Sequence, residues 1–444
     1  MASLSRRRFL QLSASVAATS FLAACVAPTA PSGGDSDGGG MASSSIEVWA
    51  YPRTENDLEI VYGPLNESFA EAHPDITVEV EVQPWGGRRE KLYAAAAAGT
   101  SPDMWDATTD TVPAYIEKGV ILGLNDFLTD EHLGNYTAAE LEAASLDGVL
   151  YMPLIEGEVN GFAYNGGILS ELGYDPATAE FSTWDSLYGL AEKAAENGYY
   201  LENLSTFNWG GFLATVHEAG GQVYADDRSH SNFTEQPAID ALTRWVTEYE
   251  NDWVPLEYAI GSVDEQGGLP DYWLSLEQAT ARREDAACVQ DVEANSDLQY
   301  VIGHARSMDG SQDPVAGLVS GQGWAITQQS EAVDAALTWL KFMITPEQIG
   351  DRANLAGTTP VGTQSKEYWS PAECTFDHVS RFGGSLFAGV DANTLWQESK
   401  VVAGPHFQAA VLGQATVEES LENIKTEIDA WLQEKYGRDR IQAA

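Results

Sequence analysis

Segments typical of strands and helices alternate between residues 46 and 119, and this alternation constrains the fold more than any other feature. Alternating β-branched residues indicate strands, and apolar residues at helical spacing or runs of alanine indicate helices. The predicted strands are residues 46–49, 76–82 and 102–107, and the predicted helices are residues 58–73, 88–98 and 112–118. This order favours an α/β fold with a largely parallel sheet that carries helices on both faces.

The length of the chain indicates that this sheet belongs to one of two lobes. Roughly 400 residues follow a polar N-terminal segment, and a single hydrophobic core rarely serves more than about 300 residues. The composition, with 44% hydrophobic and 10% aromatic residues, is that of an ordinary globular chain. In α/β sheets ligands bind beyond the carboxyl ends of the strands, so side chains that follow the predicted strands are the first candidates for a site.

The N-terminus has the features of an export signal. Residues 5–11 (SRRRFLQ) contain the paired arginines of a twin-arginine signal, and residues 22–25 (LAAC) are typical of a lipobox. The apolar run between them is shorter than the stretch of about 20 residues that spans a bilayer as a helix. We therefore predict a cleaved twin-arginine lipoprotein signal peptide over residues 1–24 and a lipid anchor on Cys25. An uncleaved amphipathic anchor is the alternative.

A flexible tether is predicted over residues 25–45, which are rich in Pro, Ser, Gly and Asp and lack apolar periodicity. At random-coil scaling such a tether holds the folded body roughly 25 Å from the membrane. We therefore expect the protein outside the cytoplasmic membrane, at the cell surface or in the periplasm.

The charge of the chain is strongly acidic, with 67 acidic and 23 basic residues and a net charge of −44. The acidic residues are scattered, so they coat the surface, and a surface of this kind repels nucleic acid and anionic lipid. We expect no nucleic-acid partner and predict a halophilic protein, because molar salt shortens the Debye length to about 3 Å. A calcium-binding surface is the weaker alternative, since the sequence has no loop with EF-hand spacing.

Three cysteines are too few for a disulfide framework. Besides Cys25, Cys288 and Cys374 either pair with each other or remain buried thiols. We favour free thiols, because the twin-arginine route exports proteins that have already folded. No metal or other cofactor is expected, since His217-Glu218 lacks the second histidine that a zinc site requires.

Further motifs occur in a characteristic order. They are KLYAAAAAGTSPD (91–103), DGVLYMP (147–153), FAYN (162–165), FSTWDSL (181–187), GQGWAI (321–326), GTTPV (357–361) and ATVEESL (415–421). In this order they resemble the extracellular solute-binding proteins of ABC importers, the large family that includes maltose-binding protein. The resemblance extends from about residue 46 to 220 and fades between 255 and 315, where ARREDAA (281–287) replaces the family's small-Gly-Lys-Ala-Met pattern.

The resemblance implies a fold, a function and partners. Each of two lobes is expected to contain a largely parallel sheet flanked by helices, with a hinge between the lobes. Lobe one would comprise residues 46–157 and 321–368, and lobe two residues 158–320 and 369–444. A monomer of this kind would bind a sugar or oligosaccharide between the lobes and deliver it to the transmembrane subunits of an ABC permease. In the motif FSTWDSL, Ser182 or Thr183 would cap a helix.

A sugar-binding cleft needs aromatic platforms for the C–H faces of the sugar and planar polar groups for its hydroxyls. Loops after the predicted strands, the first crossover between lobes and two Gly-rich turns supply such residues. The candidate ligand-binding residues are Tyr51, Trp85, Asp106, Thr108, Glu156, Glu158, Asn208, Trp209 and Trp324. Each has a structural alternative: core or hinge packing for the tryptophans, helix capping for Asp106 and Thr108, and hydrogen bonds to backbone amides for the two glutamates.

Other ligands and functions remain open at this stage. A polyol or glycerol phosphate would use Arg53, Arg88 and Arg89, although the scarcity of arginine argues weakly against an anion. An exported polysaccharide hydrolase would need a facing pair of carboxylates. Glu156 and Glu158, two positions apart on one extended segment, do not form such a pair by themselves. The sequence contains no Gly-x-Ser-x-Gly, His-Glu-x-x-His or Cys-x-x-Cys motif. We therefore expect no catalytic residues, and keep a surface sugar sensor as the third hypothesis.

Overall fold

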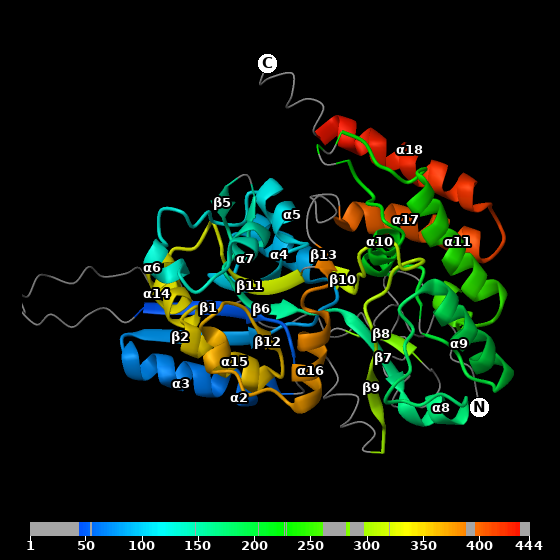
Figure 1. The fold of residues 1–444 in the computed structure, drawn as a ribbon. Coiled ribbons are helices and arrows are strands. Elements are labelled where there is room, and N and C mark those ends of the chain that lie inside the picture. Colours follow the sequence, from blue (N-terminus) through cyan, green and yellow to red (C-terminus); the bar gives the residue numbers. More distant parts are fainter. Residues whose placement is uncertain are drawn as a thin grey trace, which may run out of the picture. The chain divides into compact units, whose positions relative to one another are not determined.

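The computed structural model describes residues 44–53, 56–146, 148–202, 204–225, 227, 229–260, 281–284, 297–318, 320–387 and 396–435 (Figure 1). The predicted signal peptide, Cys25 and Cys288 lie outside the described residues, as does the side chain of Cys374. Among the described helices, none is long and apolar enough to cross a membrane.

A six-stranded sheet in the order β12-β6-β11-β3-β1-β2 organises the first part of the chain. Its strands are β1 (Ser44–Ala50), β2 (Ile76–Val82), β3 (Met104–Thr108), β6 (Leu154–Glu158), β11 (Ser320–Ile326) and β12 (Thr359–Pro360). Strand β3 is buried along its whole length, whereas β2 alternates between half-buried and exposed residues, as expected for an edge strand. The three strands predicted between residues 46 and 107 are therefore confirmed.

Pairing in this sheet is more mixed than the alternation predicts. Strand β1 pairs in parallel with β2 and β3, whereas β11 is antiparallel to both β3 and β6. Strands β1, β2, β3 and β6 thus point in one direction, and β11 is inserted against them. The alternation of residues 46–119 contains no information on β11, because this strand enters the sheet from a segment far along the chain.

Helices cover both faces of this sheet (Figure 1). On one face lie α2 (Asp57–Ile60), α3 (Tyr62–Ala72), α14 (Val333–Met343) and α15 (Pro346–Ala356). On the other lie α4 (Arg88–Ala98), α5 (Val112–Glu117) and α7 (Ala138–Ala143); the short elements α6 (Asp130–Leu133), β4 (Ser145–Leu146), β5 (Val149–Leu150) and η2 (Ser365–Glu367) complete this part. The hydrophobic core beneath them consists of residues between 46 and 155 and between 324 and 361.

The predicted helix over residues 58–73 is wrong in one respect, because it is two helices. Helix α2 ends at Ile60 and α3 begins at Tyr62. Pro64 has no amide hydrogen, so the restart places it in the first turn of α3, where no intrahelical donor is required. Helix α4 begins and ends as predicted, and Gly99 closes it with a positive φ of 69°.

A second set of elements surrounds a three-stranded sheet in the order β8-β7-β9. Strand β7 (Gly161–Asn165) is antiparallel to both β8 (Ala281–Glu284) and β9 (Tyr300–Ile302). This differs from the largely parallel sheet expected in each lobe, because the alternation that predicts parallel pairing covers only the first sheet. A two-stranded pair, β10 (Gly317–Leu318) and β13 (Leu386–Phe387), is separate from it.

Helices form most of this second part. They are α8 (Gly166–Glu171), α9 (Trp184–Glu196), α10 (Trp209–Glu218), α11 (Gln236–Glu250), α12 (Glu257–Ile260), α16 (Glu373–Phe382), α17 (Trp396–Val411) and α18 (Val417–Lys435). Helices α10, α11, α17 and α18 enclose an aromatic-rich core. The predicted cap of α9 is confirmed, since Thr183 Oγ1 accepts a hydrogen bond from the Ser186 amide at 3.3 Å.

Candidate functional site

Three strands bring polar side chains to one face of the first sheet. Asp106 on β3 lies directly opposite Trp324 on β11, and Gln322 lies opposite both Thr108 on β3 and Glu156 on β6. Directly opposed residues and residues two apart share one face, so all five side chains point to the same side of the sheet. Strands β3 and β6 both approach their carboxyl ends here, which is where α/β sheets bind ligands.

Glu156 is the centre of a buried ion-pair network. Its Oε1 accepts hydrogen bonds from Arg53 Nε at 2.8 Å and Nη2 at 2.5 Å, and its Oε2 accepts one from Arg352 Nη1. Burial by itself would raise the pKa of Glu156, but the two guanidinium groups dominate and lower this pKa to about 2. Glu156 is therefore ionised at any physiological pH, and its charge is compensated from both sides.

Asp106 differs from Glu156 because it has no hydrogen-bond partner. The side chain is 1% exposed, and neither carboxylate oxygen has a partner within the protein. Burial raises the pKa of Asp106 to about 7, although the positive charges of Arg53 and Arg352 oppose the increase. Buried polar groups almost always have partners, so a carboxylate in this state requires an explanation.

Further buried polar atoms beside Asp106 also lack partners. They are Gln322 Oε1, Trp324 Nε1 and the Nε atom of Arg352. Burial raises the pKa of Tyr62 beyond the range of ordinary tyrosines, so its hydroxyl remains protonated. Donors and acceptors thus occur together in a small region, as expected where a polar ligand is bound.

Aromatic residues beyond β1 and β2 form a stack at the edge of this region. The rings of Tyr51 and Trp85 are 5.0 Å apart with an interplanar angle of 30°. The guanidinium carbons of Arg53 and Arg88 lie 4.6 and 4.8 Å from the Trp85 ring centroid, and Trp85 Nε1 donates to Pro52 O at 3.0 Å. Burial and the nearby Asp106 carboxylate raise the pKa of Tyr51 to about 12. Trp85 thus binds the two arginines as well as its neighbouring tyrosine.

Thr108 ends β3 and connects the sheet to this stack. Its Oγ1 accepts a hydrogen bond from Arg88 Nη2 at 3.1 Å and lies 3.1 Å from Thr111 Oγ1. Contacts of Arg53 and Arg88 therefore link the candidates Tyr51, Trp85, Thr108 and Glu156, and Asp106 lies on the same face of the sheet. Their roles in ligand binding stay predictions.

The other candidates have structural roles. Asn208 caps α10, since its Oδ1 accepts a hydrogen bond from the Gly211 amide at 2.9 Å. Trp209 is 2% exposed and belongs to the core between α10 and α17. Trp324 is fully buried, with its ring 4.9 Å from that of Trp339. The backbone of Glu158 pairs with Ser320, while its side chain lies outside the described part. For these residues, too, ligand binding stays a prediction.

Three residues beside Glu156 and Asp106 were not among the candidates predicted from the sequence: Arg352, Tyr62 and Gln322. Gln322 lies within the GQGWAI motif, so a strand assignment for that motif would have placed it opposite Glu156. Arg352 gave no local signal, because it lies on α15 and is 196 positions from its partner Glu156. Tyr62 lies on α3 among ordinary core residues.

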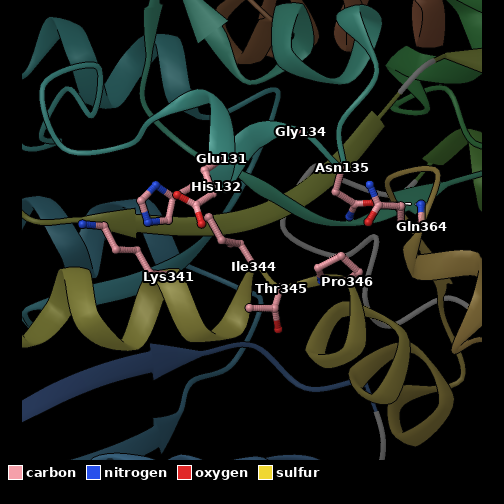
Figure 2. A pocket seen from close by; sticks show the side chains of 9 residues that line it. All are labelled: Glu131, His132, Gly134, Asn135, Lys341, Ile344, Thr345, Pro346 and Gln364. Carbon is pink, nitrogen blue, oxygen red and sulfur yellow. Dashed lines mark hydrogen bonds between the residues drawn. The ribbon is translucent and has the colours of Figure 1, made fainter.

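Two surface hollows occur elsewhere in the described residues. One, of about 350 Å³, lies between α6, the end of α14 and the start of α15 and is lined by Glu131, His132, Gly134, Asn135, Lys341, Ile344, Thr345, Pro346 and Gln364 (Figure 2). An open groove of about 850 Å³ between β9 and α16 is lined by Tyr300, Ile302, Ala372, Glu373, Asp377, Ser380 and Arg381. Neither hollow includes any of the nine candidate ligand-binding residues.

The family of bacterial extracellular solute-binding proteins matches residues 53–349, about two thirds of the sequence. The chain belongs to this family. Asp106, Glu156 and the strands β2, β3, β6 and β11 lie within the matched residues, whereas β1, Tyr51 and Arg352 lie just outside them. The resemblance found in the sequence is therefore confirmed.

Curated relatives match over parts of their length. A maltotriose-binding protein of Pyrococcus abyssi is 26% identical over 219 residues, which is 48% of this chain and 44% of that protein. The diacetylchitobiose-binding protein DasA of Streptomyces coelicolor is 23% identical over 360 residues, covering 76% of this chain and 80% of that protein. The chain thus spans less than half of the first relative and most of the second.

Solved structures confirm the fold class. An ABC substrate-binding protein of Listeria monocytogenes in complex with cycloalternan superposes with a TM-score of 0.75 and 18% identity, covering 88% of this chain and 99% of that one. A maltose-bound MalE3 of Thermotoga maritima has a TM-score of 0.72 and 18% identity, covering 87% of this chain and all of that one. The family member described here therefore has the two-lobe α/β fold of periplasmic sugar-binding proteins.

Proposed function

We propose that this solute-binding protein captures a sugar or oligosaccharide between its lobes and delivers it to the transmembrane subunits of an ABC transporter. The observation that carries the proposal is Asp106, a buried carboxylate with two unpartnered oxygens at the carboxyl end of a central strand. A carboxylate accepts hydrogen bonds from two neighbouring hydroxyls, and a sugar supplies such pairs. The names of the relatives, which bind maltotriose and diacetylchitobiose, support a saccharide.

Transport of this kind needs binding and release without any reaction of the ligand. A ligand that contacts both lobes stabilises the closed arrangement in proportion to its difference in affinity for the two states. We propose lobe one as residues 46–157 with 321–368 and lobe two as residues 158–320 with 369–444. The extent of the first core, which contains residues between 46 and 155 and between 324 and 361, supports this division.

The charge network argues against a hydrolase. Glycoside hydrolysis needs one carboxyl group to donate a proton and a second to act as base or nucleophile. Glu156, with a pKa of about 2 and both oxygens bound to arginines, is a poor proton donor and a poor nucleophile. We therefore propose that the protein has no catalytic residues.

Location follows from the N-terminal signals. We propose export by the twin-arginine route, cleavage before Cys25 and lipidation of its thiol, so that the monomer is tethered outside the cytoplasmic membrane. The excess of 67 acidic over 23 basic residues supports a halophilic protein that remains soluble in concentrated salt.

The proposal is tested by thermal shift and tryptophan fluorescence of the mature lipoprotein in detergent and molar salt. Mono- and oligosaccharides are titrated, and a ligand at 100 times its Kd is expected to add about 2.7 kcal/mol to the free energy of unfolding. The sugar is recovered afterwards and must be unchanged. A folded sample whose Tm responds to no saccharide would refute the sugar assignment.

Matched variants assign any binding to the proposed site. Asp106→Asn is expected to weaken binding of the responding saccharide at least tenfold, because it removes a charged acceptor. Asp377→Asn makes the same change at an exposed position on α16 and is expected to bind as the wild type does. Equal affinity of the two variants would move the site away from Asp106.

A further inference from the structure

Basic residues are scarce in this chain, yet several gather at the candidate site. The sequence has 23 basic and 67 acidic residues, so a random neighbourhood should be negative. Around the carboxyl ends of β1, β2 and β3, however, lie Arg53, Arg88, Arg89, Arg352 and Lys400. A cluster with the opposite sign to the rest of the surface indicates a specific anionic partner, either inside the protein or in the ligand.

Carboxylates of the protein account for two of these cations. Arg53 and Arg352 both bind Glu156, as described above. Asp106, whose pKa burial raises to about 7, is about half ionised at neutral pH, and its charge interacts with Arg53, Arg352 and Arg88. The remaining cations therefore need to be considered separately.

Arg88 is held in place by neutral groups. Its guanidinium donates to Thr108 Oγ1 at 3.1 Å and lies 4.8 Å from the Trp85 ring centroid and 5.8 Å from that of Tyr51. Among the described residues, no carboxylate lies within ion-pairing distance of Arg88. The side chain is half-buried, so its charge is less screened than that of a surface arginine. Aromatic stacking and a single hydroxyl thus orient a guanidinium that forms no direct ion pair within the described residues.

Other charged residues lie near Arg88. The only ion pair of Arg89 in the described residues is a 4.0 Å contact with Glu90, which is 71% exposed and therefore contributes little. Lys400, on α17, has a lowered pKa mainly because of burial; Asp110 opposes this shift, and the positive charges of Arg88 and Arg89 add to it. Arg88, Arg89 and Lys400 thus act on one another between β3, α4 and α17, where the carboxylates of Asp110 and Glu398 also lie.

We propose that the ligand is an acidic saccharide, a sugar that carries a carboxylate or phosphate group, and that Arg88 binds this anionic group. The inference rests on the proposed saccharide-binding function and specifies its ligand class. A guanidinium offers two parallel N–H donors that fit a carboxylate or phosphate. The hydroxyls of the same sugar would reach Asp106, which shares its strand and sheet face with Thr108, the partner of Arg88.

The test compares acidic sugars with their neutral counterparts on the mature lipoprotein. Isothermal titration is performed with D-glucuronate and D-galacturonate, with glucose 6-phosphate and glycerol 3-phosphate, and with D-glucose and D-galactose, as well as with di- and trisaccharides of galacturonate and of glucose. At least one acidic probe is expected to bind at least tenfold more tightly than the neutral probe of the same ring and length. The uronate and phosphate arms distinguish the two sources of the anion.

Variants then locate the anion. Arg88→Gln removes the charge and is expected to raise the Kd of the acidic probe about tenfold to a hundredfold, while the Kd of the neutral counterpart changes less than threefold. Arg88→Lys keeps the charge without the paired donors. Its Kd for the acidic probe should lie between the values for the wild type and for Arg88→Gln. Arg381→Gln, at an exposed arginine of α16, is the matched control for net charge. The Tm of each variant without ligand verifies that it is folded.

Each outcome has a distinct consequence. Preference for an acidic probe that Arg88→Gln abolishes and Arg381→Gln retains supports the inference. Binding of neutral saccharides with no gain from the anion overturns the inference and leaves the proposed function intact. Equal loss in Arg88→Gln and Arg381→Gln also overturns it, because the effect would then come from net charge. If no saccharide of either kind binds, both the inference and the proposed function fail.

Discussion

Replacing Asp106 by asparagine is expected to stabilise the unliganded protein while it weakens ligand binding. Asn has nearly the shape of Asp but does not ionise. In the folded protein the carboxyl group is 1% exposed, and burial raises its pKa from 3.8 to about 7. Ionisation of Asp106 therefore opposes folding, and asparagine avoids that cost.

The size of the effect depends on pH. Because the pKa of Asp106 is higher in the folded than in the unfolded state, the folded state binds the proton more tightly, and stability falls as pH rises from about 4 to about 7. A shift of about three pKa units, at about 1.4 kcal/mol each, amounts to about 4 kcal/mol above pH 7 and to almost nothing below pH 4. With an unfolding entropy of about 2.1 cal/mol/K for each of roughly 400 residues, 4 kcal/mol corresponds to about 5 °C in Tm.

Calorimetry of the unliganded wild type and Asp106→Asn between pH 4 and 8 measures this difference. We expect equal Tm values near pH 4 and a variant about 5 °C more stable at pH 8. Other titrating groups are common to both proteins and cancel in the comparison, and Asp377→Asn should show no pH-dependent difference. A variant less stable than the wild type at pH 8, or a difference that does not change with pH, would refute the assignment of Asp106 as an uncompensated buried acid.

Two further predictions concern lobe two and the membrane anchor. Arg244→Met is expected to cost about 3–5 kcal/mol at pH 8, because it leaves Glu202, Glu218 and Glu248 buried without the guanidinium that binds them at 2.7–3.1 Å. Urea unfolding should show part of this loss recovered at pH 5, where Glu248, whose pKa burial raises to about 7, is protonated; a loss independent of pH would contradict the argument. Cys25→Ser is expected to shift the protein from the membrane to the soluble fraction, as measured by immunoblot of fractionated cells, and unchanged membrane association would rule out the lipid anchor.

Local elements were predictable where a short segment contains its own signal. The edge strand at residues 76–82 alternates at every position, and Arg88–Ala98 ends at a glycine with a positive φ, so both were predicted with correct bounds. Thr183 was predicted as a helix cap because its side chain bonds within the next three residues. The break after Ile60 was missed because the apolar spacing continues across it, although Pro64 was a signal for a new start.

The candidate site was predictable only in part. Asp106 and Thr108 were named as candidates because polar residues that follow a buried strand lie near a ligand edge; the structure places both within the last three positions of β3. The partners of Glu156 could not be identified in this way, because Arg352 approaches from a helix 196 positions away. Trp324 was proposed from its position after a Gly-rich turn, and the burial of its ring against Trp339 could not be seen from that turn. Burial of a side chain depends on what covers it, and the covering helix is distant in sequence.

The sequence by itself determined the α/β class, the order of the first strands and helices, the acidic surface and the signals for export, because periodicity, caps, composition and short motifs act within a few residues. Only the tertiary structure decided that β11 enters the first sheet antiparallel between β3 and β6. That insertion faces Gln322 toward Glu156 and completes the surroundings in which Asp106 is buried without a partner. The register between two such strands is set by the free energy of packing them together. Because the segments are hundreds of residues apart, no local pattern in either one specifies it.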